Sequence, residues 1–390
     1  MNFERYHLQQ KLEEQNLIYS QQNSQNLPIN SQQSYFHFME KELFPSKKTQ
    51  PYQASIQAPL FLGSKFSYSN KPKFRQISTS PFKVLDACYL QDDFYINVLD
   101  WSKGNSISIG LNNIVYQWNF VSQEVFKVFE TSQEQDEISS VSHDLLSNSL
   151  ILSTNFGTAL LFDEQLRQIR SFRTSQDRVG VSSLRGNQLL LGDKLGRVFR
   201  YDIRQKSPVH IYEHHSQEVC GLKWSPNGEY FASGGNENKL LVHSTRIEEP
   251  IFHFKHKAAV RAIGWSTRKP KQLATGAGTA DRKLRLFDMN KMKLEKEKET
   301  GSQICSLAFS PISNELYTSH GFSENEINIW DSRSLEKKVS LKAHTARVLF
   351  MALSPDGNVL ASGAGDETLR FWDLNLKKEE KKDFFLKSDI

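Results

Sequence analysis

The chain has 390 residues, of which 38% are hydrophobic and 24% charged, and its formal net charge is +5. These are ordinary values for a globular protein, and so mild a charge argues against a nucleic-acid partner, which requires a concentrated basic face. The sequence has no run of 18 apolar residues and no signal-like start, so we expect neither a membrane span nor secretion. Cys88, Cys220 and Cys305 form no paired pattern and fit a reducing compartment, so we expect the protein in the nucleus and cytoplasm.

Residues 1–74 are predicted to be a disordered N-terminal extension. Thirteen of the first 35 residues are Gln or Asn, and such a segment cannot bury enough apolar surface to offset its ordering entropy. Two more apolar stretches interrupt it, FERYHLQQKLEEQNLI and SYFHFMEKELF. Each is either a docking peptide that orders on binding or part of a plain linker.

From about residue 75 to residue 375, short apolar runs alternate with turns rich in Gly, Asn, Asp and Pro. Seven of these runs end in an aromatic residue or a histidine, at intervals of 39 to 44 residues: Trp118, Phe162, Tyr201, His243, Phe287, Trp330 and Trp372. A period of this length with a terminal Trp-Asp is typical of WD repeats, which form four-stranded blades. The sequence therefore predicts an all-β, seven-bladed WD-repeat β-propeller at 75–375, followed by a charged C-terminal tail at 376–390.

The last repeat contains a serine, a histidine and an aspartate that could suggest a catalytic triad. His344, Ser362, Asp366 and Trp372 fall where a WD repeat usually builds a hydrogen-bonded network from Asp to His to Ser to the indole N–H. We therefore expect no catalytic residue and no enzyme. His256 and His320 have no partner at metal-ligand spacing, so each is predicted to be a satisfied or exposed histidine, and no metal or other cofactor is expected.

The stretch KVLDACYLQDDFYINVLDWS, residues 83–102, resembles the start of the propeller in the Fizzy and Fizzy-related proteins, which are coactivators of the anaphase-promoting complex. The resemblance continues through QEVCGLKWS, ASGGNENKLLV, GAGTADRKLRLFD, TGSQICSLAFS, ELYTSHGFSENEINIW, HTARVLFMALSPDG and SGAGDETLRFWD. It covers roughly residues 75–374, and LQDDFY, TGSQ and GAGDETLRFW favour the Fizzy-related branch.

This resemblance implies that the protein recruits substrates to a ubiquitin ligase and so promotes the ubiquitination and degradation of cell-cycle proteins. The implied partners are core subunits of the anaphase-promoting complex and degron-containing substrates such as cyclins, bound by a monomeric propeller. Two alternatives stay open. One is a generic WD-repeat scaffold, and the other is a pseudo-coactivator that binds degrons without activating the ligase.

The first implied binding site is for the destruction box, which has an Arg and, three residues on, a Leu. By resemblance, Asp93 in the first blade and Glu367 in the last bind the Arg together, since ring closure brings these blades side by side. Leu90 and Ile96 are expected to line the pocket for the Leu. An internal salt bridge is the alternative role for the acids; it stays open for Asp92 and is less favoured for Asp93 and Asp100.

The second implied site is for the Lys-Glu-Asn motif, which is entirely polar and needs polar partners. By resemblance these occupy equivalent places on one face around the central channel: Asp100, Asn236, Asn238, Thr279, Gln303 and Arg347. Asp100 suits the Lys, Arg347 suits the Glu, and the amides suit the Asn. The alternative for Asn236 and Asn238 is that they only form a left-handed turn.

The resemblance is incomplete at the two ends. In ERYHLQQ, residues 4–10, Arg5 and Tyr6 agree with the family's ligase-docking C-box, whereas other positions differ. The sequence finishes in FFLKSDI, so Ile390 agrees with the family's Ile-Arg tail but the Arg is missing. Finally, Ser80 precedes Pro81 in the pattern of a proline-directed phosphorylation site, or else simply starts the first strand.

Overall fold

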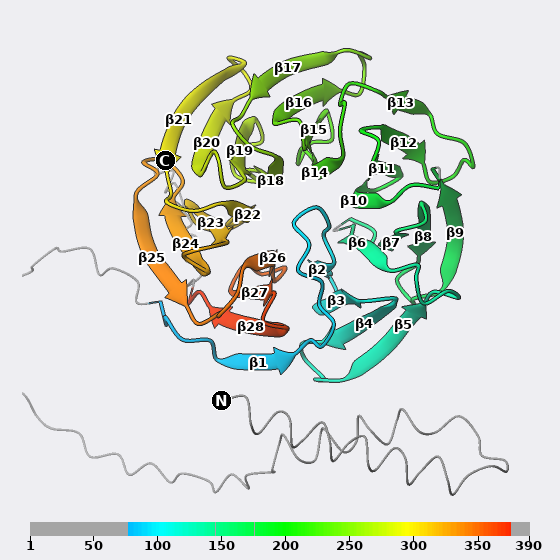
Figure 1. Cartoon of the computed structure of the whole chain (residues 1–390), viewed down its shortest axis with the longest axis horizontal. Helices are drawn as coiled ribbons and strands as arrows, with labels where there is room; N and C mark the ends of the chain where they lie inside the picture. Colours follow the sequence, from blue (N-terminus) through cyan, green and yellow to red (C-terminus); the bar gives the residue numbers. More distant parts are fainter. Residues whose placement is uncertain (1–76, 145, 175, 376–390) are drawn as a thin grey trace, which may run out of the picture. The chain divides into compact units, whose positions relative to one another are not determined.

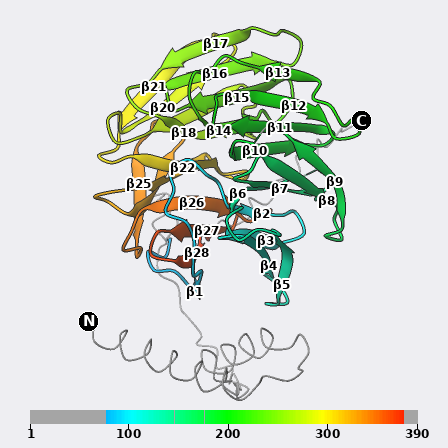
Figure 2. The ribbon, with the colours of Figure 1, turned by 45° about the vertical axis from the view of Figure 1, so that its right-hand side comes forward.

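The computed structural model describes residues 77–144, 146–174 and 176–375, and within them the backbone forms 28 strands and no helix. The strands make seven four-stranded sheets, which follow one another around a ring in chain order (Figures 1 and 2). The predicted seven-bladed propeller is therefore confirmed. Because the described residues contain no helix, they also contain no candidate membrane-spanning helix.

Each blade is numbered here by its place in the ring, and its strands run from the innermost outward. Blade one is β2 (Leu99–Trp101), β3 (Ser106–Leu111), β4 (Ile114–Asn119) and β5 (Val125–Glu130); blade two is β6 (Ile138–His143), β7 (Leu150–Thr154), β8 (Thr158–Phe162) and β9 (Gln168–Arg173); blade three is β10 (Val179–Arg185), β11 (Gln188–Asp193), β12 (Val198–Asp202) and β13 (His210–Tyr212); blade four is β14 (Val219–Trp224), β15 (Tyr230–Gly235), β16 (Lys239–Ser244) and β17 (Pro250–Lys255). Blade five is β18 (Val260–Trp265), β19 (Gln272–Ala277), β20 (Lys283–Asp288) and β21 (Lys293–Glu299); blade six is β22 (Ile304–Phe309), β23 (Glu315–His320), β24 (Glu326–Asp331) and β25 (Lys337–Lys342); blade seven is β26 (Val348–Leu353), β27 (Val359–Ala364) and β28 (Thr368–Asp373), with β1 (Lys83–Asp86) outermost.

Burial falls from the centre of each blade to its edge. Strand β18, VRAIGW, is buried at every residue, because neighbouring strands and blades cover it on all sides. The outermost strand of the same blade, β21, reads KLEKEKE and is exposed at every residue but one. Charged side chains on an outer strand also discourage pairing with a strand from another molecule.

The ring is closed by a sheet that combines the two ends of the propeller sequence. Strand β1 pairs antiparallel with β28, and Lys83 lies opposite Phe371. The ring of Phe371 then contacts Trp101 and Trp118 of blade one, with centroids 6.2 and 5.0 Å apart. Aromatic packing of this kind joins the last blade to the first.

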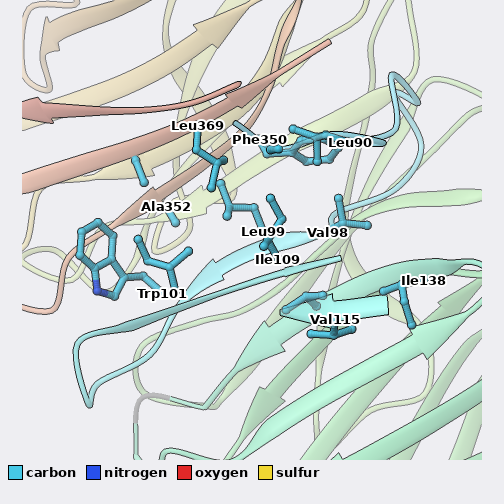
Figure 3. Close-up of a cluster of buried hydrophobic side chains, with 14 of the residues drawn as sticks. Leu90, Val98, Leu99, Trp101, Ile109, Val115, Ile138, Phe350, Ala352 and Leu369 are labelled. Atoms are coloured by element: carbon cyan, nitrogen blue, oxygen red, sulfur yellow. The ribbon is translucent and has the colours of Figure 1, made fainter. Parts of the chain in front are cut away.

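Residues 87–98, the central segment, connect β1 to β2. The segment leaves the outer edge of blade seven, passes into the middle of the ring and returns to the inner strand of blade one (Figure 1). Leu90 and Ile96 anchor it in a buried cluster that includes Phe350 and Leu369 of blade seven (Figure 3). The fold thus places an irregular, acidic stretch of chain within reach of several blades.

The described residues begin at 77 and end at 375. The predicted extension at 1–74 and the charged tail at 376–390 lie outside them, and so do the two apolar stretches and the docking residues Arg5, Tyr6 and Ile390.

Candidate functional site

The hydrogen-bonded network predicted for blade seven is present. His344 Nδ1 lies 3.0 Å from Asp366 Oδ2, His344 Nε2 lies 2.8 Å from Ser362 Oγ, and the indole of Trp372 donates to the same Ser362 oxygen at 2.9 Å. Burial alone would raise the pKa of Asp366, but hydrogen bonds from His344, Thr368 and a backbone N–H hold it below its usual range. Ser362 is fully buried, so this group supports the blade and faces no substrate.

The other two histidines considered above are buried and have partners. His256 Nδ1 lies 3.0 Å from Asp281, and His320 bonds Ser302 through Nδ1 and Thr318 through Nε2. Burial lowers the pKa of His320 to about 4, so its ring is neutral near neutral pH. The prediction of satisfied histidines is confirmed for both, and no group of three or more possible metal ligands occurs among the described residues.

The two adjacent aspartates of the central segment form ion pairs with different blades. Asp92 accepts from Arg347, which precedes the inner strand of blade seven, at 2.9 Å. Asp93 accepts from Arg178, which precedes the inner strand of blade three, at 2.7 Å. The internal salt bridge that the sequence left open for Asp92 exists. The less favoured one, at Asp93, exists as well, and this corrects the interpretation given above.

Arg178 also binds a second carboxylate, so three charges share one location. Its Nε and Nη2 donate to Glu218 at 2.9 Å each, while Nη1 holds Asp93. Burial raises the pKa of Glu218 in spite of this guanidinium. Two carboxylates share one arginine here, and 31% of the Asp93 side chain remains exposed.

Glu367 contacts the start of the central segment. It is exposed in the turn between β27 and β28, with a positive φ of 57°, and its carbonyl accepts from the Ala87 N–H at 2.8 Å. The neighbouring Gly365 lies so close to Asp92 that an added Cβ would come within 2.9 Å of the Asp92 carboxyl carbon. Asp92 is thus the acid of the segment that packs against the Glu367 turn, whereas Asp93 turns to blade three.

The two apolar residues expected at the destruction-box site are core residues. Leu90 is 4% exposed and Ile96 is 1% exposed. Figure 3 shows Leu90 beside Phe350, within the cluster that also contains Leu99 and Leu369. Their apolar surface is already buried in this structure, so they anchor the central segment and present no open wall.

Five of the six residues assigned to the Lys-Glu-Asn motif share one face of the ring. Asn236 and Asn238 lie in the turn after β15, Thr279 in the turn after β19, and Gln303 and Arg347 just before β22 and β26. Inner strands begin where second strands end, as the pairing of Val260 with Ala277 shows, so these turns and loops meet at the same end of the blades. Thr279 donates to Gln303 at 2.8 Å, and Tyr95 of the central segment donates to Asn236 at 3.2 Å. Asn238 has a φ of 71°, as its alternative role in a left-handed turn requires.

Asp100 does not join this face. It lies on β2 and accepts from the backbone N–H of Trp101 at 2.9 Å and of His143 at 2.7 Å. His143 is the last residue of β6, so Asp100 sits toward the opposite end of the inner strands. Its carboxylate satisfies the backbone of the next blade, and the expectation of an equivalent position is wrong for this residue.

Sequence reasoning missed Tyr95, Arg178 and Glu218 as members of the central cluster. Arg178 is 85 residues from its partner Asp93 and belongs to a different repeat. No local motif marks such a pair, because it depends on the path of the central segment through the ring.

Comparison with known proteins identifies the family of this chain. Residues 85–372 match the model of the CDC20/Fizzy WD40 domain. The chain belongs to this family. It is 38% identical over 314 residues to "Meiotic fizzy-related protein 1" of Schizosaccharomyces pombe, which covers 80% of this chain and 74% of that protein. It is 41% identical over 303 residues to "B-type cell cycle switch protein ccs52A" of Medicago truncatula, which covers 77% of this chain and 64% of that protein.

Two further CDC20/Fizzy comparisons extend the assignment. The chain is 40% identical over 319 residues to "Anaphase-promoting complex subunit cdc20" of Dictyostelium discoideum, covering 80% of this chain and 64% of that protein. A chain in the solved "Crystal Structure of Mitotic Checkpoint Complex" superposes with a TM-score of 0.75 at 35% identity, covering 84% of this chain and 99% of that one. The plant and Dictyostelium relatives are therefore matched over somewhat less than two thirds of their length. The resemblance to Fizzy-related proteins is confirmed.

Proposed function

We propose that this CDC20/Fizzy protein is a substrate-recruiting coactivator of the anaphase-promoting complex, which binds destruction-box and Lys-Glu-Asn degrons and promotes the ubiquitination of cell-cycle proteins. The observation that carries the proposal is the family match over residues 85–372, a range that includes the central segment and strands from all seven blades. The chain is similar to a protein named as a subunit of that complex, and this supports the anaphase-promoting complex as its partner. The substrates, such as cyclins, the monomeric state and the location in nucleus and cytoplasm belong to the proposal as well.

In this proposal the chain is an adaptor and the ligase supplies the chemistry. The Ser-His-Asp group of blade seven supports this assignment, because its serine is fully buried and bonded to Trp372 and His344. Docking on the ligase is assigned to Arg5, Tyr6 and Ile390, and Ser80 is proposed as a regulatory phosphorylation site. Ser80 is exposed and lies three residues before the start of β1.

The destruction-box arginine is proposed to bind at the central segment, with Asp93 of the segment and Glu367 of blade seven as its acids. Asp93 is partly exposed and Glu367 is exposed, while Asp92, which directly precedes Asp93, packs beside Gly365 in the Glu367 turn. A guanidinium can bind carboxylates through paired, charge-assisted hydrogen bonds, which are stronger than neutral ones. The incoming arginine would compete with Arg178 and Arg347 for these acids, so both internal pairs are expected to rearrange on binding.

The Lys-Glu-Asn motif is proposed to bind the neighbouring polar face formed by Asn236, Asn238, Thr279, Gln303 and Arg347. Amide and hydroxyl groups there offer donors and acceptors to the motif's Asn, and Arg347 offers a cation to its Glu. Asp100 is left out of this set, since both of its oxygens already accept backbone hydrogen bonds.

The test measures binding of two fluorescent peptides to the full chain by anisotropy, one with a destruction box and one with a Lys-Glu-Asn motif. Both should bind, and scrambled peptides should not. Asp93→Arg should abolish destruction-box binding and spare the other peptide, because a like-charge contact costs on the order of several kcal/mol. Glu367→Arg should do the same. Equal loss of both peptides in a folded variant would show that two separate sites do not exist.

The peptide assay and a ubiquitination assay together separate the alternatives. A generic scaffold would bind neither peptide. A pseudo-coactivator would bind both and yet fail to stimulate ubiquitination when added to purified anaphase-promoting complex, whereas a coactivator stimulates it. Ser80→Glu should weaken association with the complex if Ser80 is regulatory, and unchanged association would remove that part of the proposal.

A further inference from the structure

Arg261, on the innermost strand of blade five, places its guanidinium in the middle of the ring. Only 6% of the residue is exposed. Its Nη1 donates to the carbonyls of Cys305 in β22 and Leu349 in β26, the latter at 2.6 Å. Its Nη2 donates to the carbonyl of Ile96 in the central segment at 2.6 Å. One side chain therefore ties blades five, six and seven to the central segment.

The surroundings of Arg261 are unusual for a buried cation. Among the described residues it has no ion-pair partner, and its Nε has no hydrogen-bond acceptor. The rings of Phe94 and Phe350 lie 5.6 and 5.4 Å from the guanidinium. Burial lowers the pKa of Arg261. A buried charge held only by carbonyls and ring faces is a poor source of stability, which points to a role in fixing geometry.

The central segment depends on side chains to fix its conformation, because its own backbone forms few hydrogen bonds. Between Gln91 and Ile96, no backbone group pairs with another backbone group in the part of the chain that the structure describes. The carbonyl of Asp92 is held by Arg347, and the carbonyl of Ile96 is held by Arg261. An irregular stretch without ladder hydrogen bonds keeps one arrangement only when side chains impose it.

We propose that Arg261 is a positioning residue for the destruction-box site: it fixes Ile96 and Phe94 and thereby sets the direction in which Asp92 and Asp93 present their carboxylates. This proposal rests on the proposed function for its ligand, while the hold on the segment is a claim about the free protein. In this proposal Arg261 itself touches no peptide, since it is almost completely buried and its guanidinium is bound to the carbonyl of Ile96.

A matched control lies on the same blade. Arg285, on β20, is 4% exposed and equally buried, but its guanidinium binds Asp281 and His256 inside the blade. Replacing it with methionine removes a buried arginine without touching the central segment. Arg261→Met therefore removes the hydrogen bond to the central segment, whereas Arg285→Met removes only bonds within blade five. Arg261→Lys keeps a positive charge that can donate to fewer carbonyls.

The experiment uses the full chain and three readouts: thermal unfolding, amide hydrogen exchange, and the affinities of the two degron peptides. Arg261→Met should selectively speed exchange at the amides of Tyr95 and Asn97, which donate to Asp93 and to the carbonyl of Ser139. It should also raise the Kd of the destruction-box peptide about tenfold, as expected if about a tenth of the molecules keep the binding arrangement. The Kd of the Lys-Glu-Asn peptide should change by less than about twofold, and Arg261→Lys should recover part of the loss. Arg285→Met should lower the unfolding temperature without any of these local effects.

Unchanged exchange at the amides of Tyr95 and Asn97 in folded Arg261→Met, or the same exchange change in Arg285→Met, would overturn the positioning role. If Arg261→Met does not fold, Arg261→Lys decides: faster local exchange supports the proposal, and none contradicts it. If the wild-type chain binds neither peptide, the proposed function fails, yet the exchange comparison still decides whether Arg261 holds the segment.

Discussion

The hydrogen-bonded network of blade seven and the central segment are both polar arrangements inside the same ring, but they are built differently. In the network, His344, Ser362, Asp366 and Trp372 are at most 28 residues apart in sequence, and all lie on the strands of blade seven or in the loops next to them. In the central segment, the partners are 85, 165 and 255 residues apart and come from blades three, five and seven. The network stabilises one blade, whereas the segment's contacts exist only when the whole ring is closed.

The two regions also differ in exposure, so changes in them should have different effects on folding stability. Ser362 is fully buried, so a polar group left unpaired in the network would lower the free energy of unfolding by its full desolvation cost. In the central segment, 47% of the Asp92 side chain and 21% of the Arg347 side chain are exposed, and such pairs contribute little to folding. We therefore expect network changes to alter unfolding and segment changes to alter binding.

The largest expected effect on stability comes from the equivalent network of blade six. Thr318→Val keeps the shape but removes the oxygen that accepts from the Trp330 indole at 2.7 Å and bonds His320 at 2.7 Å. Because the residue is fully buried, the free energy of unfolding should fall by about 2–3 kcal/mol. Denaturation in urea measures it. The exposed Thr267→Val is the control and should change by less than about 0.5 kcal/mol. A small effect at Thr318, or loss of peptide binding by the folded variant, would break the comparison.

A second prediction uses blade four, where His243 stands at the place of the tryptophan. Its ring stacks on Phe231 with centroids 4.7 Å apart, its Nδ1 has no partner, and burial lowers its pKa to about 3. The unfolded pKa is about 6.5, so the unfolded chain binds the extra proton as pH falls below that value. Stability from the neutral ring is complete above pH 6.5 and is lost as pH falls toward 3, which amounts to about 2 kcal/mol between pH 7 and pH 5.

His243→Phe should therefore lose about 2 kcal/mol less than the wild type between pH 7 and pH 5, as measured by urea denaturation at both values. His253, an exposed histidine on β17, offers the matched replacement His253→Phe, which should keep the wild-type pH dependence. Equal pH dependence in all three proteins would show that His243 does not titrate in the predicted way.

The smallest expected effect on stability is in the central segment. Asp92→Asn weakens a partly exposed ion pair with Arg347, so the free energy of unfolding should change by less than about 0.5 kcal/mol. The same substitution at Asp366 should cost about 1–3 kcal/mol, because three donors of blade seven lose a charged acceptor. Similar losses at the two positions would mean that the segment's ion pairs stabilise the ring as strongly as the network does.

The same contrast explains what the sequence could predict. Each repeat must bury its own strands and satisfy its own polar groups, so the spacing of Trp330 and Trp372 predicts blades, and His344 with Asp366 predicts the network. The ion pair of Asp93 with Arg178 depends on where the central segment runs after ring closure, and no repeat contains that information. The position of Asp100 is not predictable from the sequence for a related reason, since its motif does not reveal which end of the inner strand it occupies.

The claim that a carboxylate of the central segment binds a degron arginine is tested most directly by a double-mutant cycle. The cycle combines Asp93→Asn in the full chain with a destruction-box peptide whose Arg is replaced by neutral citrulline, and anisotropy gives the four affinities. If the two groups meet, the coupling energy should be about 1.5–3 kcal/mol, as for a hydrogen bond between charged partners. Additive effects, with a coupling below about 0.5 kcal/mol, would contradict the account and leave Asp93 as a partner of Arg178 alone.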